Sequence, residues 1–129
     1  MIVDSSALLA ILRDEPESIR CARAIADAPT RRISAATFLE TAIVIDGSQD
    51  PIASRRFDEL LQEGGFVIEP VTEAQARIAR EAYRDFGKGR AHRARLNFGD
   101  CFAYSLAKAT GEPLLFKGDD FVHTDIGRA

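Results

Sequence analysis

Residues 1–12, MIVDSSALLAIL, decide the fold class of this chain. Ile2 and Val3 form a short apolar run of the kind that becomes a buried strand, and the run ends at once in the acid Asp4. Serines follow, which are favoured residues at the start of a helix, and residues 7–12 are apolar enough to pack against a core. The sequence therefore predicts a strand, an acid at its carboxyl end, and a helix directly after it.

The same alternation repeats along the chain. Further strand-like runs lie at residues 32–35, 66–68 and 114–116, and helical patterns lie at about residues 14–28, 37–45, 52–63, 73–86 and 97–108. Short strands separated by long helices predict a parallel sheet with helices on both faces. We expect an α/β fold with three layers, α/β/α, around a central parallel sheet of four to five strands. The ligand site of such a sheet lies beyond the carboxyl ends of its strands.

Composition limits the class of protein further. A chain of 129 residues with 46% apolar content is long enough for one core and too short for two, so we expect a single domain over residues 1–129. The formal net charge of −3 argues against a protein that coats nucleic acid with cations. Cys21 and Cys101 lack metal-ligand spacing and are expected to be buried thiols in a reducing compartment. With no leader-like start and no apolar run of membrane length, we expect a cytoplasmic protein without a membrane partner.

Acidic residues share one setting, because each follows a strand-like run or lies in the first turns of the next helix. They are Asp4, Glu40, Asp100 and the pair Asp119–Asp120. Carboxylates gathered at one edge of a sheet repel one another unless a cation neutralises them, and oxygen ligands select hard ions such as Mg²⁺ or Mn²⁺. A metal-activated water could then hydrolyse a phosphodiester without a Ser, Cys or His nucleophile. Each acid also has an ordinary explanation: Asp4 as a helix cap, Asp100 as a complement to the helix dipole, and Asp119 and Asp120 as turn residues. Glu40 could lie on an exposed stripe of its helix. Only the joint placement of the acids therefore predicts a metal site.

A basic stretch precedes the third acidic position. Between residues 77 and 95, seven Lys and Arg side chains stand against two acids. An acidic metal pocket needs nearby cations to attract a polyanion, so the basic residues that directly precede Asp100 are expected to contact a phosphate backbone. The alternative is an ordinary charged surface that keeps the protein in solution. The candidate RNA-binding residues are Lys88, Arg90, Arg93 and Arg95, joined by Lys117.

Four segments together resemble a known family in order and spacing. They are VDSSA at residues 3–7, ATFLET at 36–41, LNFGDCFAY at 96–104 and PLLFKGDDF at 113–121. The chain resembles the PIN-domain ribonucleases, specifically the VapC-type toxins of bacterial type II toxin–antitoxin (VapBC) modules. The resemblance covers essentially the whole chain and implies a PIN-like, Rossmann-like fold.

The resemblance also implies an activity and its residues. It implies an endoribonuclease that uses Mg²⁺ or Mn²⁺, cuts RNA of the tRNA or rRNA class, forms a homodimer, and is inhibited by a cognate VapB-like antitoxin. Its catalytic acids correspond to Asp4, Glu40, Asp100 and Asp119, with Asp4 and Asp100 as metal ligands. Its supporting residues correspond to Ser6, Asn97 and Asp120. Many members carry an acid where this chain has Gly118, which leaves Asp119 and Asp120 as alternatives for the fourth acid.

Two other functions stay open from the residues alone. A phosphatase or phosphotransfer domain would use Asp4 as a covalent nucleophile, although such sites usually place a second acid two residues on, where this chain has Ser6. A non-catalytic partner-binding module would keep the fold without the reaction. Retention of all the acids argues against that module, because a site without a function has no reason to keep their mutual repulsion.

Overall fold

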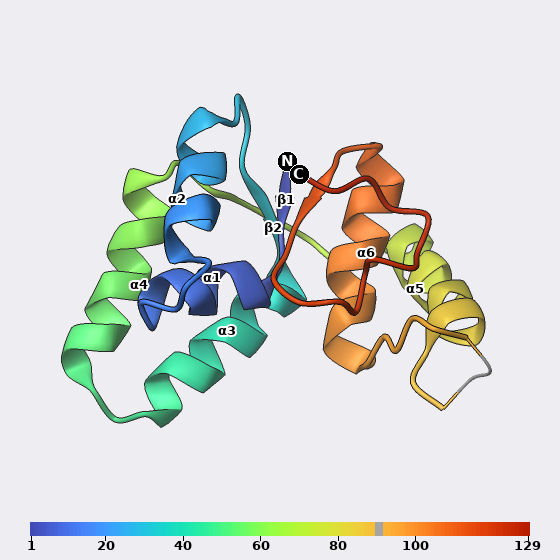
Figure 1. Cartoon of the computed structure of the whole chain (residues 1–129), viewed down its shortest axis with the longest axis horizontal. Coiled ribbons are helices and arrows are strands. Elements are labelled where there is room, and N and C mark those ends of the chain that lie inside the picture. The colour runs from blue at the N-terminus through green and yellow to red at the C-terminus, as the bar shows by residue number, and fades with distance from the viewer. Residues whose placement is uncertain (90–91) are drawn as a thin grey trace.

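A computed structural model describes residues 1–89 and 92–129 of the chain (Figure 1). Its elements alternate as the sequence predicts. In chain order they are β1 (Ile2–Val3), α1 (Ser5–Leu12), α2 (Ser18–Asp27), β2 (Arg32–Ser34), α3 (Ala35–Gly47), α4 (Pro51–Glu63), β3 (Val67–Glu69), α5 (Glu73–Phe86), α6 (Phe98–Thr110) and β4 (Leu114–Leu115). Within the described residues, the helices are too short or too polar to cross a membrane.

The four strands form one parallel sheet in the order β3-β2-β1-β4. The chain moves outward from β1 through β2 to β3, and then returns to place β4 on the other side of β1. The strand order therefore reverses between β1 and β4. This is the switch point at which open α/β sheets bind their ligands. Asp4 follows β1 and Lys117 follows β4, so both residues lie at this point.

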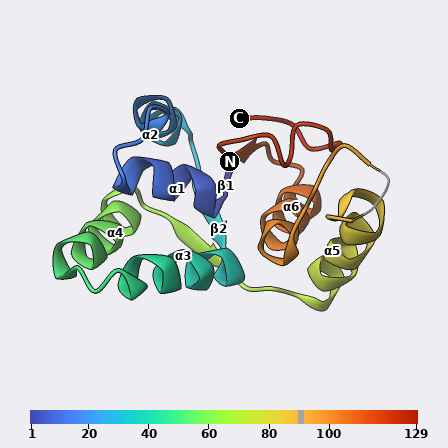
Figure 2. The same cartoon turned by 60° about the horizontal axis from the view of Figure 1, so that its bottom comes forward.

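Helices cover both faces of the sheet, which confirms the predicted three layers. Helices α1 to α4 lie on one side and α5 and α6 on the other (Figures 1 and 2). Successive strand residues point to opposite faces, so the two residues of β1 serve different cores. Ile2 packs with the side chains of α5 and α6, whereas Val3 packs with those of α1 to α4. Leu114 and Leu115 of β4 divide in the same way.

Polar caps fix where the site-bearing helices begin. Asp4 caps α1, Ser34 caps α3, and Asn97 caps α6, each by accepting a backbone N–H of the first turn. Helices α1 and α3 start directly after β1 and β2, so their first turns stand at the carboxyl edge of the sheet. Helix α6 is brought to the same edge by contacts with α3. The caps thereby place three helix starts around one region.

Candidate active site

Asp4 is a buried carboxylate with only one of its oxygens bonded. The residue is 2% exposed, and its Oδ2 accepts hydrogen bonds from the Ser6 N–H at 3.0 Å and the Ser6 hydroxyl at 2.6 Å. Its Oδ1 is also buried, yet it has no hydrogen-bond partner among the described residues. An unsatisfied buried oxygen is costly and calls for an explanation. A bound cation at Oδ1 would provide one.

Asp100 lies in the first turn of α6 and forms a reciprocal capping box with Asn97. The Asn97 N–H donates to Asp100 Oδ2 at 2.9 Å, and the Asp100 N–H donates to Asn97 Oδ1 at 2.9 Å. Asp100 therefore has a structural role in the helix start, as the N3 residue of this capping box. The capping box also fixes the side chain, which is 9% exposed, at the edge of the sheet.

Glu40 reaches the same region from α3. Its carboxylate lies against Gly99, where a Cβ would overlap the carboxylate oxygens and stand 2.7 Å from Glu40 Cδ. The missing side chain at position 99 lets the half-buried Glu40 lie over the first turn of α6, directly beside Asp100. The sequence contains no local signal for this contact, because it joins two helices separated by a crossover.

The acids are coupled electrostatically. Burial raises the pKa of Asp100 from 3.8 to about 7, with further increases from the charges of Asp4, Asp120 and Glu40 and an opposing effect of the Asn97 N–H. Burial also raises the pKa of Asp4, against the Ser6 hydrogen bonds and with a contribution from Glu40. Low dielectric and neighbouring negative charge both disfavour ionised carboxylates. A cation between these groups would relieve both effects.

The predicted fourth position is occupied by two exposed acids. Asp119 and Asp120 stand side by side after β4. Of the two, Asp120 is the acid whose charge raises the pKa of Asp100. The structure thus brings Asp4, Glu40, Asp100 and Asp120 into one electrostatic group.

The sequence predicts two direct metal ligands, Asp4 and Asp100. In residues 1–89 and 92–129, no three His, Cys, Asp or Glu side chains converge closely enough to bind one ion directly. Such a spacing suits an ion that takes one or two direct carboxylates and keeps several waters, as Mg²⁺ usually does. The free Oδ1 of Asp4 and the purely oxygen donor set fit that type of ion.

The predicted RNA-binding residues fall into three groups. Lys88, Arg93 and Arg95 are exposed, and no carboxylate in the described part of the chain pairs with them. Arg90 lies outside the described residues. Lys117 instead has its ammonium group against Glu15 and Glu17, so its surroundings differ from those expected of a free cation.

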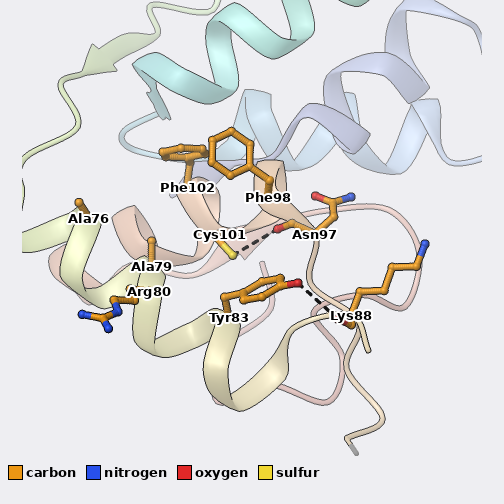
Figure 3. A pocket seen from close by; sticks show the side chains of 9 residues that line it. All are labelled: Ala76, Ala79, Arg80, Tyr83, Lys88, Asn97, Phe98, Cys101 and Phe102. Atoms are coloured by element: carbon orange, nitrogen blue, oxygen red, sulfur yellow. Dashed lines mark hydrogen bonds between the residues drawn. The ribbon is translucent and has the colours of Figure 1, made fainter. Parts of the chain in front are cut away.

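An apolar groove that the sequence analysis did not single out runs between α5 and α6 (Figure 3). Its volume is about 610 Å³, and Phe98, one of its lining residues, is 79% exposed. Phe98 and Phe102 stand one turn apart on α6 with ring centroids at 4.9 Å, a spacing visible in the sequence. Asn97 lies next to Phe98, and Lys88 lies farther from the two rings, beside Tyr83 (Figure 3). None of the acids above lines the groove, although Asn97, the hydrogen-bond partner of Asp100, does.

Comparisons with known proteins agree with this fold. The profile of the family described as PIN domain matches residues 1–127. Ribonuclease VapC28 of Mycobacterium tuberculosis is 58% identical over 129 residues, which are 100% of this chain and 97% of that protein. The chain therefore belongs to the PIN-domain family and, more narrowly, to its VapC ribonucleases. The resemblance inferred from the four sequence segments is confirmed.

Solved structures show the same fold at low sequence identity. Mycobacterium tuberculosis VapC20, described as a sarcin–ricin loop cleaving toxin, superposes with a TM-score of 0.78 at 17% identity and covers 99% of this chain and 97% of its own. VapBC-1 from nontypeable Haemophilus influenzae superposes with a TM-score of 0.72 at 18% identity, covering 99% and 95%. Neither a phosphatase nor a non-catalytic module is favoured by these relatives.

Replacing Asp100 with Asn should change how stability depends on pH. Between pH 3.8 and about 7 the folded protein holds a proton on Asp100 that the unfolded chain has released, so the free energy of unfolding falls as pH rises through this window. Asp100→Asn has no titrating carboxyl group at this position, so its unfolding free energy does not fall in this way. The substitution also keeps a hydrogen-bond acceptor for Asn97. In chelator, its unfolding free energy relative to wild type should rise by about 1 kcal/mol or more from pH 4.5 to pH 8, as measured by urea denaturation. A difference that does not vary with pH would contradict the raised pKa of Asp100.

Adding a methyl group at Gly99 should displace Glu40 without unfolding the protein. The Cβ of Gly99→Ala would meet the far end of a flexible side chain, which can move away. We expect RNA cleavage to fall about ten- to a hundredfold, because small displacements of reacting groups have effects of that size. Gly47→Ala is the matched control, since a Cβ there meets nothing within 4 Å. If both variants cleave RNA at the same rate, the position of Glu40 does not matter for the reaction.

Proposed function

We propose that this chain is the toxin of a type II toxin–antitoxin module, acting as an endoribonuclease that depends on Mg²⁺ or Mn²⁺. The observation that carries the proposal is the buried, unbonded Oδ1 of Asp4 within a group of coupled acids. The 58% identity to a named ribonuclease over the full chain supports the reaction class. The donor chemistry supports the choice of ion.

Asp4 and Asp100 would hold the ion. When bound, it would lower the pKa of a water molecule and offset negative charge on the phosphate group. Ser6 keeps Asp4 Oδ2 occupied and so leaves Oδ1 for the ion, while Asn97 fixes the rotamer of Asp100. Both supporting residues act by orienting ligands, as hydrogen-bonding neighbours of metal ligands generally do.

Glu40 would accept the proton of the attacking water. Its carboxylate lies beside the first turn of α6, within electrostatic reach of Asp4 and Asp100. As water adds to phosphorus and the bond to the leaving oxygen breaks, Glu40 would accept the proton that the water loses. His92 and His123 are the only histidines of the chain, and neither is needed for this step.

The fourth acid is assigned to Asp120, with Asp119 as the alternative that the sequence left open. Only a charge close to Asp100 can share its ion or its water, and Asp120 raises the pKa of Asp100. Asp119 would then be an ordinary residue of the turn after β4.

Single substitutions can distinguish the roles of Asp119 and Asp120. Asp120→Asn should lower the rate of RNA cleavage about tenfold or more, through loss of one carboxylate from the group around the ion. Asp119→Asn is the matched neighbour and should remain within about twofold of wild type. The assignment is reversed if Asp119→Asn is the slower enzyme of the two when both are assayed at the same Mn²⁺ concentration.

RNA of the tRNA or rRNA class is the proposed substrate. Exposed Lys88, Arg93 and Arg95 precede the helix that carries Asp100, and their charge would attract the phosphate backbone to an otherwise acidic edge. A protein of the same fold, VapC20, is described as cleaving the sarcin–ricin loop, which agrees with a structured RNA target.

A VapB-like antitoxin and a second copy of the chain are the proposed protein partners. The solved structure of VapBC-1 from nontypeable Haemophilus influenzae shares this fold. Exposed apolar side chains also lie on the surface of α3 and α6, where Leu39 is 57%, Ile43 62% and Phe98 79% exposed. Exposed side chains of this kind are typical of protein interfaces.

The decisive substitution for the proposed function is Asp4→Asn. It removes the ligand charge while keeping an acceptor for Ser6, so RNA cleavage should fall by about a thousandfold or more and the fold should persist. The measurement is cleavage of total cellular RNA with and without Mn²⁺, with mapping of the product ends. Asp58→Asn, an exposed site on α4, is the control and should cleave normally. Wild-type rates from pure Asp4→Asn protein would refute the mechanism.

A further inference from the structure

Lys117 makes two kinds of contact at the switch point of the sheet. Its ammonium group forms an ion pair with Glu15 Oε2 and lies 3.8 Å from Glu17 Oε2. Its backbone N–H donates to the Ser6 hydroxyl oxygen at 3.0 Å. The residue therefore links the connection between α1 and α2 to the serine that supports Asp4.

The contact with Ser6 sets the direction of a hydrogen bond. A hydroxyl group has one hydrogen and two lone pairs. Because the Ser6 oxygen accepts from Lys117, its own hydrogen is directed to Asp4 Oδ2, at 2.6 Å. Both Ser6 donors then occupy Oδ2 and leave Oδ1 of Asp4 unbonded. The arrangement presents one defined oxygen to an ion.

The end of β4 is held in place by neighbouring side chains of the α1–α2 region. Arg20 of α2 donates to the Phe116 carbonyl at 3.0 Å, one residue before Lys117. The Lys117 side chain is 36% exposed and that of Glu15 is 23% exposed, so their pair is partly shielded from water. Two successive residues after β4 are thus fixed against the same connection.

We propose that the Lys117–Glu15–Glu17 ion cluster positions Asp4 for metal binding, by holding the Lys117 N–H against Ser6. Lys117 is a positioning residue in this scheme and does not contact RNA. The inference rests on the proposed function, in which Asp4 is a metal ligand. It replaces the expectation from sequence that Lys117 binds phosphate, because two acids already hold its charge.

Calorimetric titration with Mn²⁺ tests the cluster without relying on catalysis. Lys117→Met removes the charge and keeps the length of the side chain. It should weaken Mn²⁺ binding about tenfold, which is the lower end of the effect usually seen when a residue that supports a metal ligand is changed. The KM for RNA should stay unchanged. Lys117→Arg keeps a cation near both acids and should recover affinity to within about threefold of wild type. Glu15→Gln, which breaks the pair from the other side, should weaken Mn²⁺ binding in the same direction as Lys117→Met.

Lys108→Met is the matched control. Lys108 forms an ion pair with Asp125 in the last turn of α6, at the opposite end of that helix from Asp100. An exposed pair of this kind stabilises a fold little, so Lys108→Met should bind Mn²⁺ as wild type does. Equal weakening by Lys108→Met and Lys117→Met would show a general effect on stability and overturn the inference.

The competing role gives the opposite pattern. If Lys117 contacts phosphate, Lys117→Met will raise the KM for RNA and reduce the salt dependence of binding, with Mn²⁺ affinity unchanged. That result overturns the inference and leaves the proposed function standing. Failure of the wild-type protein to bind Mn²⁺ at millimolar concentration would overturn the proposed function itself, and with it the positioning role. Exchange of the Lys117 amide hydrogen provides a second readout in metal-free protein, and it should accelerate in Lys117→Met but not in Lys108→Met.

Discussion

Burial of the Asp4 and Asp100 carboxylates within electrostatic reach of each other is the constraint on which the rest of the site depends. Charged groups taken out of water destabilise a protein unless they are paired, and like charges add to the effect. The chain offsets part of this through Ser6 at Asp4 and Asn97 at Asp100, which donate hydrogen bonds to one oxygen of each carboxylate. The effects of burial and neighbouring charge exceed those of the hydrogen bonds, and they raise the pKa of Asp100 to about 7. In the proposed function, a divalent cation would relieve this destabilisation of the ionised carboxylates.

The topology explains why these two acids meet. β1 is a central strand with neighbours on both sides, so the residue that follows it is surrounded by the ends of other elements. α6 crosses to the same edge because Gly99 allows it to approach the Glu40 side chain of α3. The helix caps that begin α1 and α6 use the same residues, Asp4 and Asp100, that gather the charge. Structural and chemical roles therefore coincide at these positions, and neither role excludes the other.

The sequence predicts much of this fold because the relevant signals are local. The short apolar runs, the helical patterns and the acid after the first strand are each visible within a dozen residues, and all four strands and the three layers are confirmed. The contacts that define the site are not local. Lys117 and Glu15 are 102 positions apart, so a lysine that the sequence presents as one more cation near an acidic site is held by acids from another segment. The contact of Glu40 with Gly99, and the groove beside Phe98, likewise arise from packing between helices, which no periodicity in the sequence records.

Anomalous diffraction from crystals of the wild-type protein grown with Mn²⁺ tests the central claim most directly, because it locates the ion without reference to catalysis. The account predicts an anomalous peak bonded to Oδ1 of Asp4 and adjacent to Asp100, with Glu40 and Asp120 around its waters. A peak elsewhere on the surface, or an occupied site in which Asp4 Oδ1 remains unbonded, would contradict it.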